Sequence, residues 1–268
     1  MKHDTRRLLG SAPRRAVCIV LWLAFAAASA FATDVTFLGS SGNRQAAVEF
    51  KMVGNVLYVT LRNTSMTDAL EPVDMLAGVF FDTANNPVLT PEWARVDAGS
   101  CLIYPNDSGC TSPVPDPGTV DGGMNIGGEW AYHYDSESTP VVPTGQRYGI
   151  GAVGLDFFGS PGWTISGPNI EDPEAIDGGN FSLAPKGDDP QTGNGGIEDR
   201  YYIRYAAVFK FLAPGFDPGA EIRNVRFQYG TDFNEPWIPG DNVPEPATLA
   251  MIGGGLIGLG FWRRRAVR

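Results

Sequence analysis

Hydrophobic and polar residues alternate on both sides of Gly54-Asn55, and this alternation constrains the fold more than any other feature of the chain. A two-residue turn at Gly54-Asn55 would align two strands so that their apolar residues share one face. The predicted cross-strand partners are Val53 with Val56, Met52 with Leu57, Phe50 with Val59 and Val48 with Leu61. The turn and the register together predict an antiparallel hairpin with one buried face.

Other apolar or alternating stretches predict further strands, namely Met75–Asp82, Glu129–Tyr134, Arg147–Phe158, Arg200–Leu212 and Ile222–Tyr229. Arg200–Leu212 is apolar on both faces, which is typical of a strand near the middle of a layered sheet. The 34 glycines and 21 prolines cluster between these stretches, and no segment with helical periodicity interrupts them. The pattern predicts an all-β domain over residues 33–242, an antiparallel β-sandwich of jelly-roll type.

The N-terminal 32 residues have the pattern of a secretory signal peptide. Basic residues come first, Ala16–Ala27 form an apolar core, and small residues follow at Ala28-Ser29-Ala30 and Ala30-Phe31-Ala32, where a signal peptidase would cut. We therefore predict that residues 1–32 are removed on export and take no part in the fold.

The C-terminal segment 243–268 combines three features in a fixed order. Pro244-Glu245-Pro246 must be extended, because the two prolines fix φ and remove backbone donors. Ala247–Trp262 is uncharged, and Arg263, Arg264 and Arg265 follow it directly, as expected of a span whose arginines stay in the cytoplasm. At ~1.5 Å per residue the span measures only ~24 Å, which is short for a ~30 Å hydrocarbon core. The segment therefore predicts a single membrane-spanning helix that is marginal as an anchor.

This order of features resembles the PEP-CTERM sorting signal, which the membrane enzyme exosortase processes. The resemblance implies that Pro244, Glu245 and Pro246 are the recognition element and that Arg263, Arg264 and Arg265 hold the tail in place. It also implies export, transient retention in the inner membrane through residues 247–262, cutting near Pro-Glu-Pro, and delivery to the cell surface or extracellular matrix. The alternative is an ordinary single-span anchor in which Pro-Glu-Pro is only a linker.

The body of the chain resembles one subgroup of exosortase-dependent surface proteins. The stretches that carry this resemblance are Asn63-Thr64-Ser65 and residues 72–82, 129–132, 154–159, 176–181 and 225–230. The resemblance implies a surface location and brings no activity with it.

Charge and cysteine content agree with export. Residues 33–242 contain 11 basic and 28 acidic side chains, a formal charge of −17, which argues against nucleic acid and anionic lipid as partners. Cys101 and Cys110 are the two cysteines that remain after the signal peptide, and in an oxidising compartment they predict one disulfide. A metal pair would need two further soft ligands.

Catalytic patterns are few. His133 is the one histidine outside the signal peptide, and no Gly-x-Ser-x-Gly elbow accompanies it. We expect a structural histidine at a strand edge, on the face opposite Trp130, Tyr132 and Tyr134. A secreted hydrolase with two carboxylates remains an alternative, although 28 acids make the pair impossible to choose. We predict that the protein is not an enzyme.

Two binding functions are further alternatives. Calcium could bind at the acidic turns Asp177-Gly178-Gly179-Asn180, Asp188-Asp189 or 193–199, because these place oxygen ligands on flexible backbone. Carbohydrate could stack on Trp130, Tyr132 and Tyr134, or on Trp163 and Trp237 in predicted loops. The main prediction is a structural or adhesive component of the envelope or its exopolysaccharide, sorted by exosortase.

Overall fold

The computed structural model describes residues 34–104, 109–110, 118–134, 145–154, 170, 180–197 and 200–243. The predicted signal peptide and the segment from Pro244 onward lie outside these ranges, as do Trp163 and residues 155–158 and 171–179.

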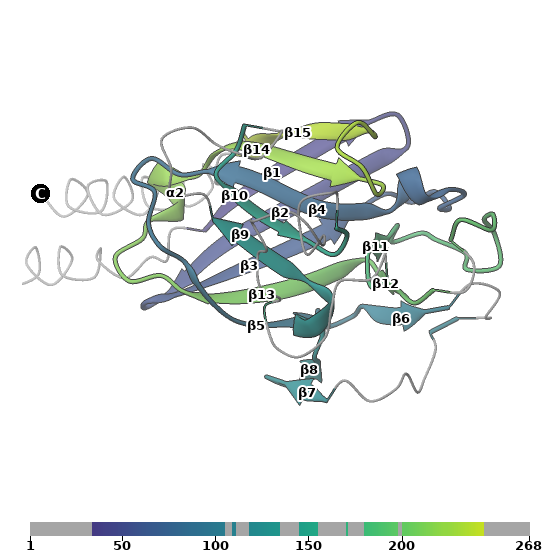
Figure 1. The fold of residues 1–268 in the computed structure, drawn as a ribbon, viewed down its shortest axis with the longest axis horizontal. Coiled ribbons are helices and arrows are strands. Elements are labelled where there is room, and N and C mark those ends of the chain that lie inside the picture. Colours follow the sequence, from purple (N-terminus) through teal and green to yellow (C-terminus); the bar gives the residue numbers. More distant parts are fainter. Residues whose placement is uncertain are drawn as a thin grey trace, which may run out of the picture. The chain divides into compact units, whose positions relative to one another are not determined.

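The regular secondary structure of the described chain is almost entirely β (Figure 1). Its strands are β1 (Val35–Ser41), β2 (Arg44–Val53), β3 (Val56–Asn63), β4 (Leu76–Asp82), β5 (Thr90–Val96), β6 (Cys101–Ile103), β7 (Thr119–Val120), β8 (Gly123–Met124), β9 (Ala131–Tyr134), β10 (Tyr148–Gly151), β11 (Leu183–Ala184), β12 (Tyr202–Arg204), β13 (Ala206–Leu212), β14 (Arg223–Tyr229) and β15 (Trp237–Val243). Two single-turn 3-10 segments, η1 (Pro72–Asp74) and η2 (Gly127–Glu129), and one turn of α-helix, α2 (Pro218–Glu221), interrupt them. The all-β prediction is confirmed.

The predicted hairpin forms with the predicted register. β2 and β3 pair antiparallel with Val53 opposite Val56, Phe50 opposite Val59 and Val48 opposite Leu61. Gly54 has φ +64°, a conformation that glycine adopts without a Cβ penalty, so the turn closes where the sequence places it. Val48, Phe50, Val59 and Leu61 are fully buried, as one shared apolar face requires.

The main sheet has the strand order β5-β13-β3-β2-β1-β15-β14-β4-β11-β12-β6, and β10 and β9 extend from β4. All pairs are antiparallel except the short parallel pair β11–β12. The two ends of this path, β5 and β6, follow one another in the chain across residues 97–100, so the sheet is nearly closed like a barrel. A sandwich of two separate sheets does not describe this connectivity, because β1 and β15 join the two halves edge to edge.

Aromatic side chains fill the space between the two halves of the sheet. Phe50 of β2 meets Phe81 of β4 with ring centroids 5.0 Å apart, and Trp130 meets Phe209 of β13 at 4.9 Å. Tyr132 of β9 likewise lies 5.0 Å from Phe211. Such rings bury large apolar areas and set the distance between the packed faces. The core therefore lies between β2–β3–β13 and β4–β10–β9.

Most predicted strands exist, with corrections to their extent or position. The predicted strand Arg147–Phe158 is shortened to β10, since residues 152–154 form no strand, and Glu129 lies in η2 before β9 begins. The predicted strand Arg200–Leu212 is two strands, because Tyr205 has φ 94° and turns the chain between β12 and β13. Trp237, predicted in a loop, is the first residue of β15. The predictions Met75–Asp82 and Ile222–Tyr229 match β4 and β14 to within one residue.

Candidate functional site at the end of strand β15

Strand β15 has the composition of a turn, Trp-Ile-Pro-Gly-Asp-Asn-Val, yet it is held by neighbours on both sides. Its first part pairs with β14, from Gln228 opposite Trp237 to Val225 opposite Gly240. Its last three residues pair with β1, where Asp241 lies opposite Leu38 and Val243 opposite Thr36. The strand thus passes from one half of the sheet to the other, and we call the β1–β15 contact the seam.

The backbones of β1 and β15 approach closely just beyond the last pair of the seam. A Cβ atom at Gly39 would lie 2.7 Å from the carbonyl oxygen of Pro239 and 2.9 Å from side-chain atoms of Ile238 and Phe227. Real Cβ atoms do not approach other atoms this closely, so only glycine fits here. Ile238 is 2% exposed and is the one buried side chain of β15.

The outer face of the seam is an open groove of about 430 Å³, whose lining includes Leu38, Ser40, Gln45, Pro239, Asp241 and Val243. Asp241, Asn242 and Val243 are all exposed. The groove carries one carboxylate, that of Asp241, so it does not supply the carboxylate pair that a glycosidase uses.

The two ends of the described domain lie side by side. Val243 is the residue before Pro-Glu-Pro, and its partner Thr36 lies four residues after Ala32, the later of the two predicted signal-peptide cleavage points. Close by, Lys51 Nζ and Asp34 Oδ2 form an ion pair at 3.2 Å. The first and last strands of the described chain therefore meet at Thr36 and Val243, residues that in the sequence lie near the predicted cleavage point and the predicted sorting signal.

The predicted disulfide forms between Cys101 and Cys110, whose Cα atoms are 5.6 Å apart. It ties the edge strand β6 to residue 110, and the Arg204 guanidinium on β12 lies over it, with Nη2 3.4 Å from Cys110 Sγ. The cross-link therefore fastens the β6 end of the sheet.

His133 lies on β9, which pairs with β10 alone among the described strands. Its position opposite Gly149 is buried, with 7% of the residue exposed. Ala131 packs in a different apolar cluster from Trp130 and Tyr132, so the predicted division of faces is correct. An edge-strand location agrees with the expected structural role.

Of the predicted calcium turns, only parts are described. Asp188 is largely buried, its Oδ1 accepts a 2.7 Å hydrogen bond from the Ala69 amide, and burial raises the pKa of its carboxyl to about 6. Asp68 Oδ1 accepts a hydrogen bond from the Asp189 amide. Within the described ranges no group of three or more His, Cys, Asp or Glu side chains is placed to hold a metal ion. Asp177 and residues 198–199 lie outside those ranges.

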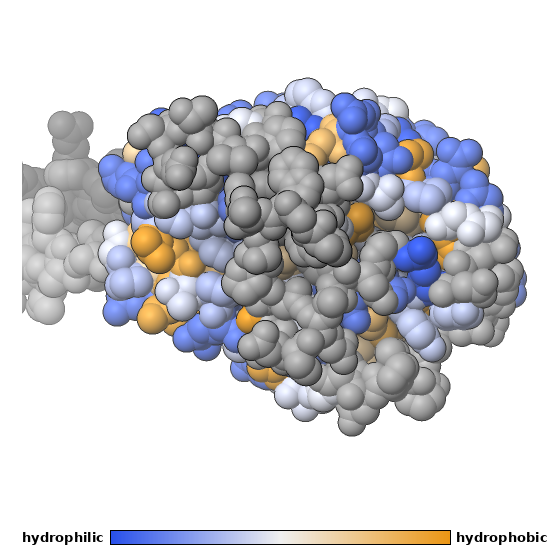
Figure 2. Space-filling model, in the orientation of Figure 1, coloured by the Kyte–Doolittle hydropathy of each residue, from blue (hydrophilic) through white to orange (hydrophobic). Residues whose placement is uncertain are grey.

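The aromatic candidates for carbohydrate binding separate into two groups. Trp130 and Tyr132 are buried in the core, so they are not exposed for stacking on a sugar. Trp237 is 50% exposed, and the Arg226 guanidinium lies 4.5 Å from the centroid of its ring. In the part of the surface that Figure 2 colours, hydrophobic and hydrophilic residues are interspersed.

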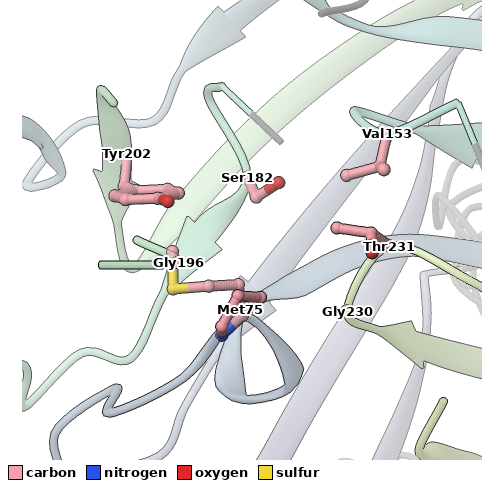
Figure 3. A pocket seen from close by; sticks show the side chains of 8 residues that line it. Met75, Val153, Ser182, Gly196, Tyr202, Gly230 and Thr231 are labelled. Atoms are coloured by element: carbon pink, nitrogen blue, oxygen red, sulfur yellow. The ribbon is translucent and has the colours of Figure 1, made fainter. Parts of the chain in front are cut away.

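A second hollow lies where β4, β11 and β14 begin or end. Figure 3 shows Val153 and Thr231 on one side of it and Tyr202 on the other, with Met75 between. Its volume of about 20 Å³ is enough for one water molecule and too small for a sugar.

Comparison with known protein families finds a match in the C-terminal segment. A family model described as the PEP-CTERM protein-sorting motif matches residues 242–265. Comparisons with curated proteins and with solved structures give no match. In the described part of the chain no helix is long and apolar enough to cross a membrane, and the predicted span 247–262 lies outside that part. The chain carries a PEP-CTERM protein-sorting motif at residues 242–265, which implies an exported protein that exosortase processes at the membrane.

Proposed function

We propose that the β domain is a structural or adhesive, non-catalytic component of the cell surface or its exopolysaccharide matrix, delivered there by exosortase. The observation that carries the proposal is the position of the sorting motif: the match begins at Asn242, inside β15. Because the motif starts within the last described strand, the whole β domain lies before it and would be the part of the chain that is sorted. The high negative charge of residues 33–242 favours solubility of the released form.

The proposed delivery has four steps. Residues 1–32 direct export, and residues 247–262 hold the chain in the inner membrane while Arg263, Arg264 and Arg265 remain in the cytoplasm. Exosortase recognises Pro244-Glu245-Pro246 and cuts near it, and the released domain moves to the surface or matrix. Membership of the domain in the subgroup of exosortase-dependent surface proteins belongs to the same proposal.

Cell fractionation and intact mass test the delivery. In a host that contains exosortase, the wild-type protein should appear outside the inner membrane without Arg263–Arg265. A variant with Pro244, Glu245 and Pro246 replaced by alanine should stay in the membrane at full length, and so should the wild-type protein in a host without exosortase. Ser40→Ala, an exposed change on β1, serves as the control and should be processed normally. A mature form that retains its terminal arginines would refute the proposal.

Carbohydrate binding is a second candidate, and the exposed indole of Trp237 favours it. Arg226 covers one face of this ring, and stacking on a sugar would use the other face. Retention of the domain on purified exopolysaccharide should fall with Trp237→Ala and persist with Trp237→Phe, which keeps an aromatic face. Leu212→Ala, an exposed apolar change elsewhere, is the control. Equal retention of the wild type and the three variants would show that Trp237 does not bind the sugar, and only the structural role would remain.

Calcium binding can be tested in the same preparation. The described residues Asp188 and Asp189 belong to one of the predicted acidic turns. Calorimetric titration with calcium and melting curves with and without calcium should show binding and a higher Tm if the turns form a site. The absence of both effects would remove calcium from the proposal.

A further inference from the structure

The sorting motif and the folded sheet share residues. The motif match begins at Asn242, and β15 ends at Val243, so Asn242 and Val243 belong to both. Only three residues separate Val243 from Ala247, where the predicted membrane span begins. Three extended residues reach at most about 10 Å, so a fully paired β15 holds the edge of the sheet close to the membrane surface.

A processing enzyme needs extended backbone that it can enclose. Enzymes and binding domains that take peptides as strands contact backbone groups along several residues. In the folded domain β1 already occupies one side of Asp241–Val243, through the pairs Leu38–Asp241 and Thr36–Val243. Paired in this way, the residues directly before Pro-Glu-Pro are not accessible on that side.

The same three residues can leave the sheet without opening the core. Their side chains are exposed, and they pair with β1, whereas the register with β14 stops at Gly240. Ile238, the buried side chain of β15, lies in the part that pairs with β14. Detachment of Asp241–Val243 therefore leaves the anchored half of β15 in place, and it doubles the free chain from three residues to six, about 20 Å when extended.

We propose that exosortase must enclose extended backbone directly before Pro-Glu-Pro. In the native chain Asp241–Val243 supply it by detaching from β1, so that processing of the native chain requires this end of the seam to open. The proposal rests on the proposed function, since it takes exosortase as the enzyme. The substrate site then extends upstream of Pro244 to Asp241, and Trp237–Gly240 stays in the sheet during processing.

A covalent lock across the seam tests the proposal. Thr36 and Val243 lie opposite each other, and facing Cα atoms of antiparallel strands are about 4.5–5.5 Å apart, within the range of a disulfide. The variant Thr36→Cys/Val243→Cys locks β15 to β1. The matched control Ser40→Cys/Gln45→Cys locks the exposed register pair between β1 and β2 and leaves β15 free. Mass spectrometry of the purified proteins verifies each cross-link beside the native one.

We expect the locked seam to lower the rate of processing at least ten-fold, while the control is cut like the wild type. Adding a thiol reductant to the cells should restore cutting of the locked variant. A Gly-Ser insertion of six residues between Val243 and Pro244 should also restore it, because it supplies about 20 Å of free chain without opening the seam.

Cutting of the cross-linked variant at the wild-type rate would overturn the proposal. The proposal would also be overturned if the cross-linked variant that carries the six-residue insertion were not cut. The cross-link would then prevent cutting by damaging the domain and not by holding β15 against β1. A wild-type protein that exosortase does not cut would instead refute the proposed function, and this result is separate from the other two.

Discussion

The close approach of β1 and β15 at Gly39 leads to a quantitative prediction. In Gly39→Ala, the added methyl group would lie 2.7 Å from the Pro239 carbonyl oxygen and 2.9 Å from side-chain atoms of Ile238 and Phe227. The oxygen belongs to the backbone, so rotation of a side chain cannot relieve that contact. The two strands must move apart by several tenths of an ångström.

The expected cost follows from the number and nature of these contacts. Inserting a methyl group into a packed site typically costs about 1–3 kcal/mol, and with three contacts below 3.0 Å we expect about 2 kcal/mol. For a domain of this size about 1 kcal/mol lowers Tm by roughly 2–4 °C. Gly39→Ala should therefore lower Tm by about 4–8 °C.

Thermal unfolding of the purified exported protein, followed by circular dichroism or calorimetry, measures this effect. Ser40→Ala is the matched control, because residue 40 is the next position on β1 and its side chain is exposed. We expect its Tm within about 1 °C of the wild type, as for surface substitutions in general. If Gly39→Ala melted as close to the wild type as Ser40→Ala does, the close packing of the seam would be refuted.

Three further predictions concern other parts of the domain. Replacing Cys101 and Cys110 by serine should lower the free energy of unfolding by about 2–3 kcal/mol, since the disulfide closes a loop of about ten residues. Urea titration of the variant and of the wild type measures this difference. Equal midpoints of the two titrations would contradict the prediction. The Asp188 carboxyl has a pKa raised to about 6 by burial, so the folded domain binds its proton more tightly than the unfolded chain, whose carboxyl titrates near 4. The contribution of the Asp188 carboxyl to stability is complete below about pH 4 and is lost as the pH rises through about 6. Asp188→Asn should therefore flatten the dependence of Tm on pH between these values. An unchanged dependence would contradict the raised pKa of Asp188. Gln228 is fully buried, and its Nε2 donates to the carbonyl oxygens of Tyr229 and Asp232 at 2.9 and 3.0 Å. Gln228→Met should therefore lower the free energy of unfolding by about 1–3 kcal/mol in the same urea titration. A loss below about 0.5 kcal/mol would show that these hydrogen bonds stabilise the fold little.

Local signals were sufficient for the parts of the fold that depend on neighbouring residues. The β2–β3 hairpin needs only its own alternation and a turn at Gly54, so its full register could be predicted. The sorting motif is also a linear signal, and the match to residues 242–265 confirms it. The disulfide needed only the number of cysteines and the expectation of export.

The break at Tyr205 could not be predicted, because its cause is distant in the sequence. The Tyr205 amide donates to the Ala184 carbonyl, and the Tyr205 carbonyl accepts from the Asn63 amide. These bonds hold the residue at φ 94° although the flanking pattern continues as a strand. Periodicity reports which faces are apolar and says nothing about bonds to other elements.

Strand β15 escaped prediction for a related reason. Pro239, Gly240 and Asp241 are turn residues by composition, and only Ile238 is buried, so no alternating pattern marks the strand. Its pairing with β1 joins residues about 200 positions apart. The sequence could therefore place the sorting signal but not its attachment to the seam.

The position of β15 also orders folding relative to export. The seam needs β1 and β15, the first and last of the described strands, so in a chain that is exported unfolded it cannot close before Val243 has crossed the membrane. Until then the edges of β1 and β14 that β15 covers remain open, and open strand edges bind other chains. Because the motif begins at Asn242, within β15, the strand that completes the sheet also carries the start of the sorting motif. In the proposed delivery, residues 247–262 would hold the domain at the membrane, apart from other chains, during the interval in which β15 pairs.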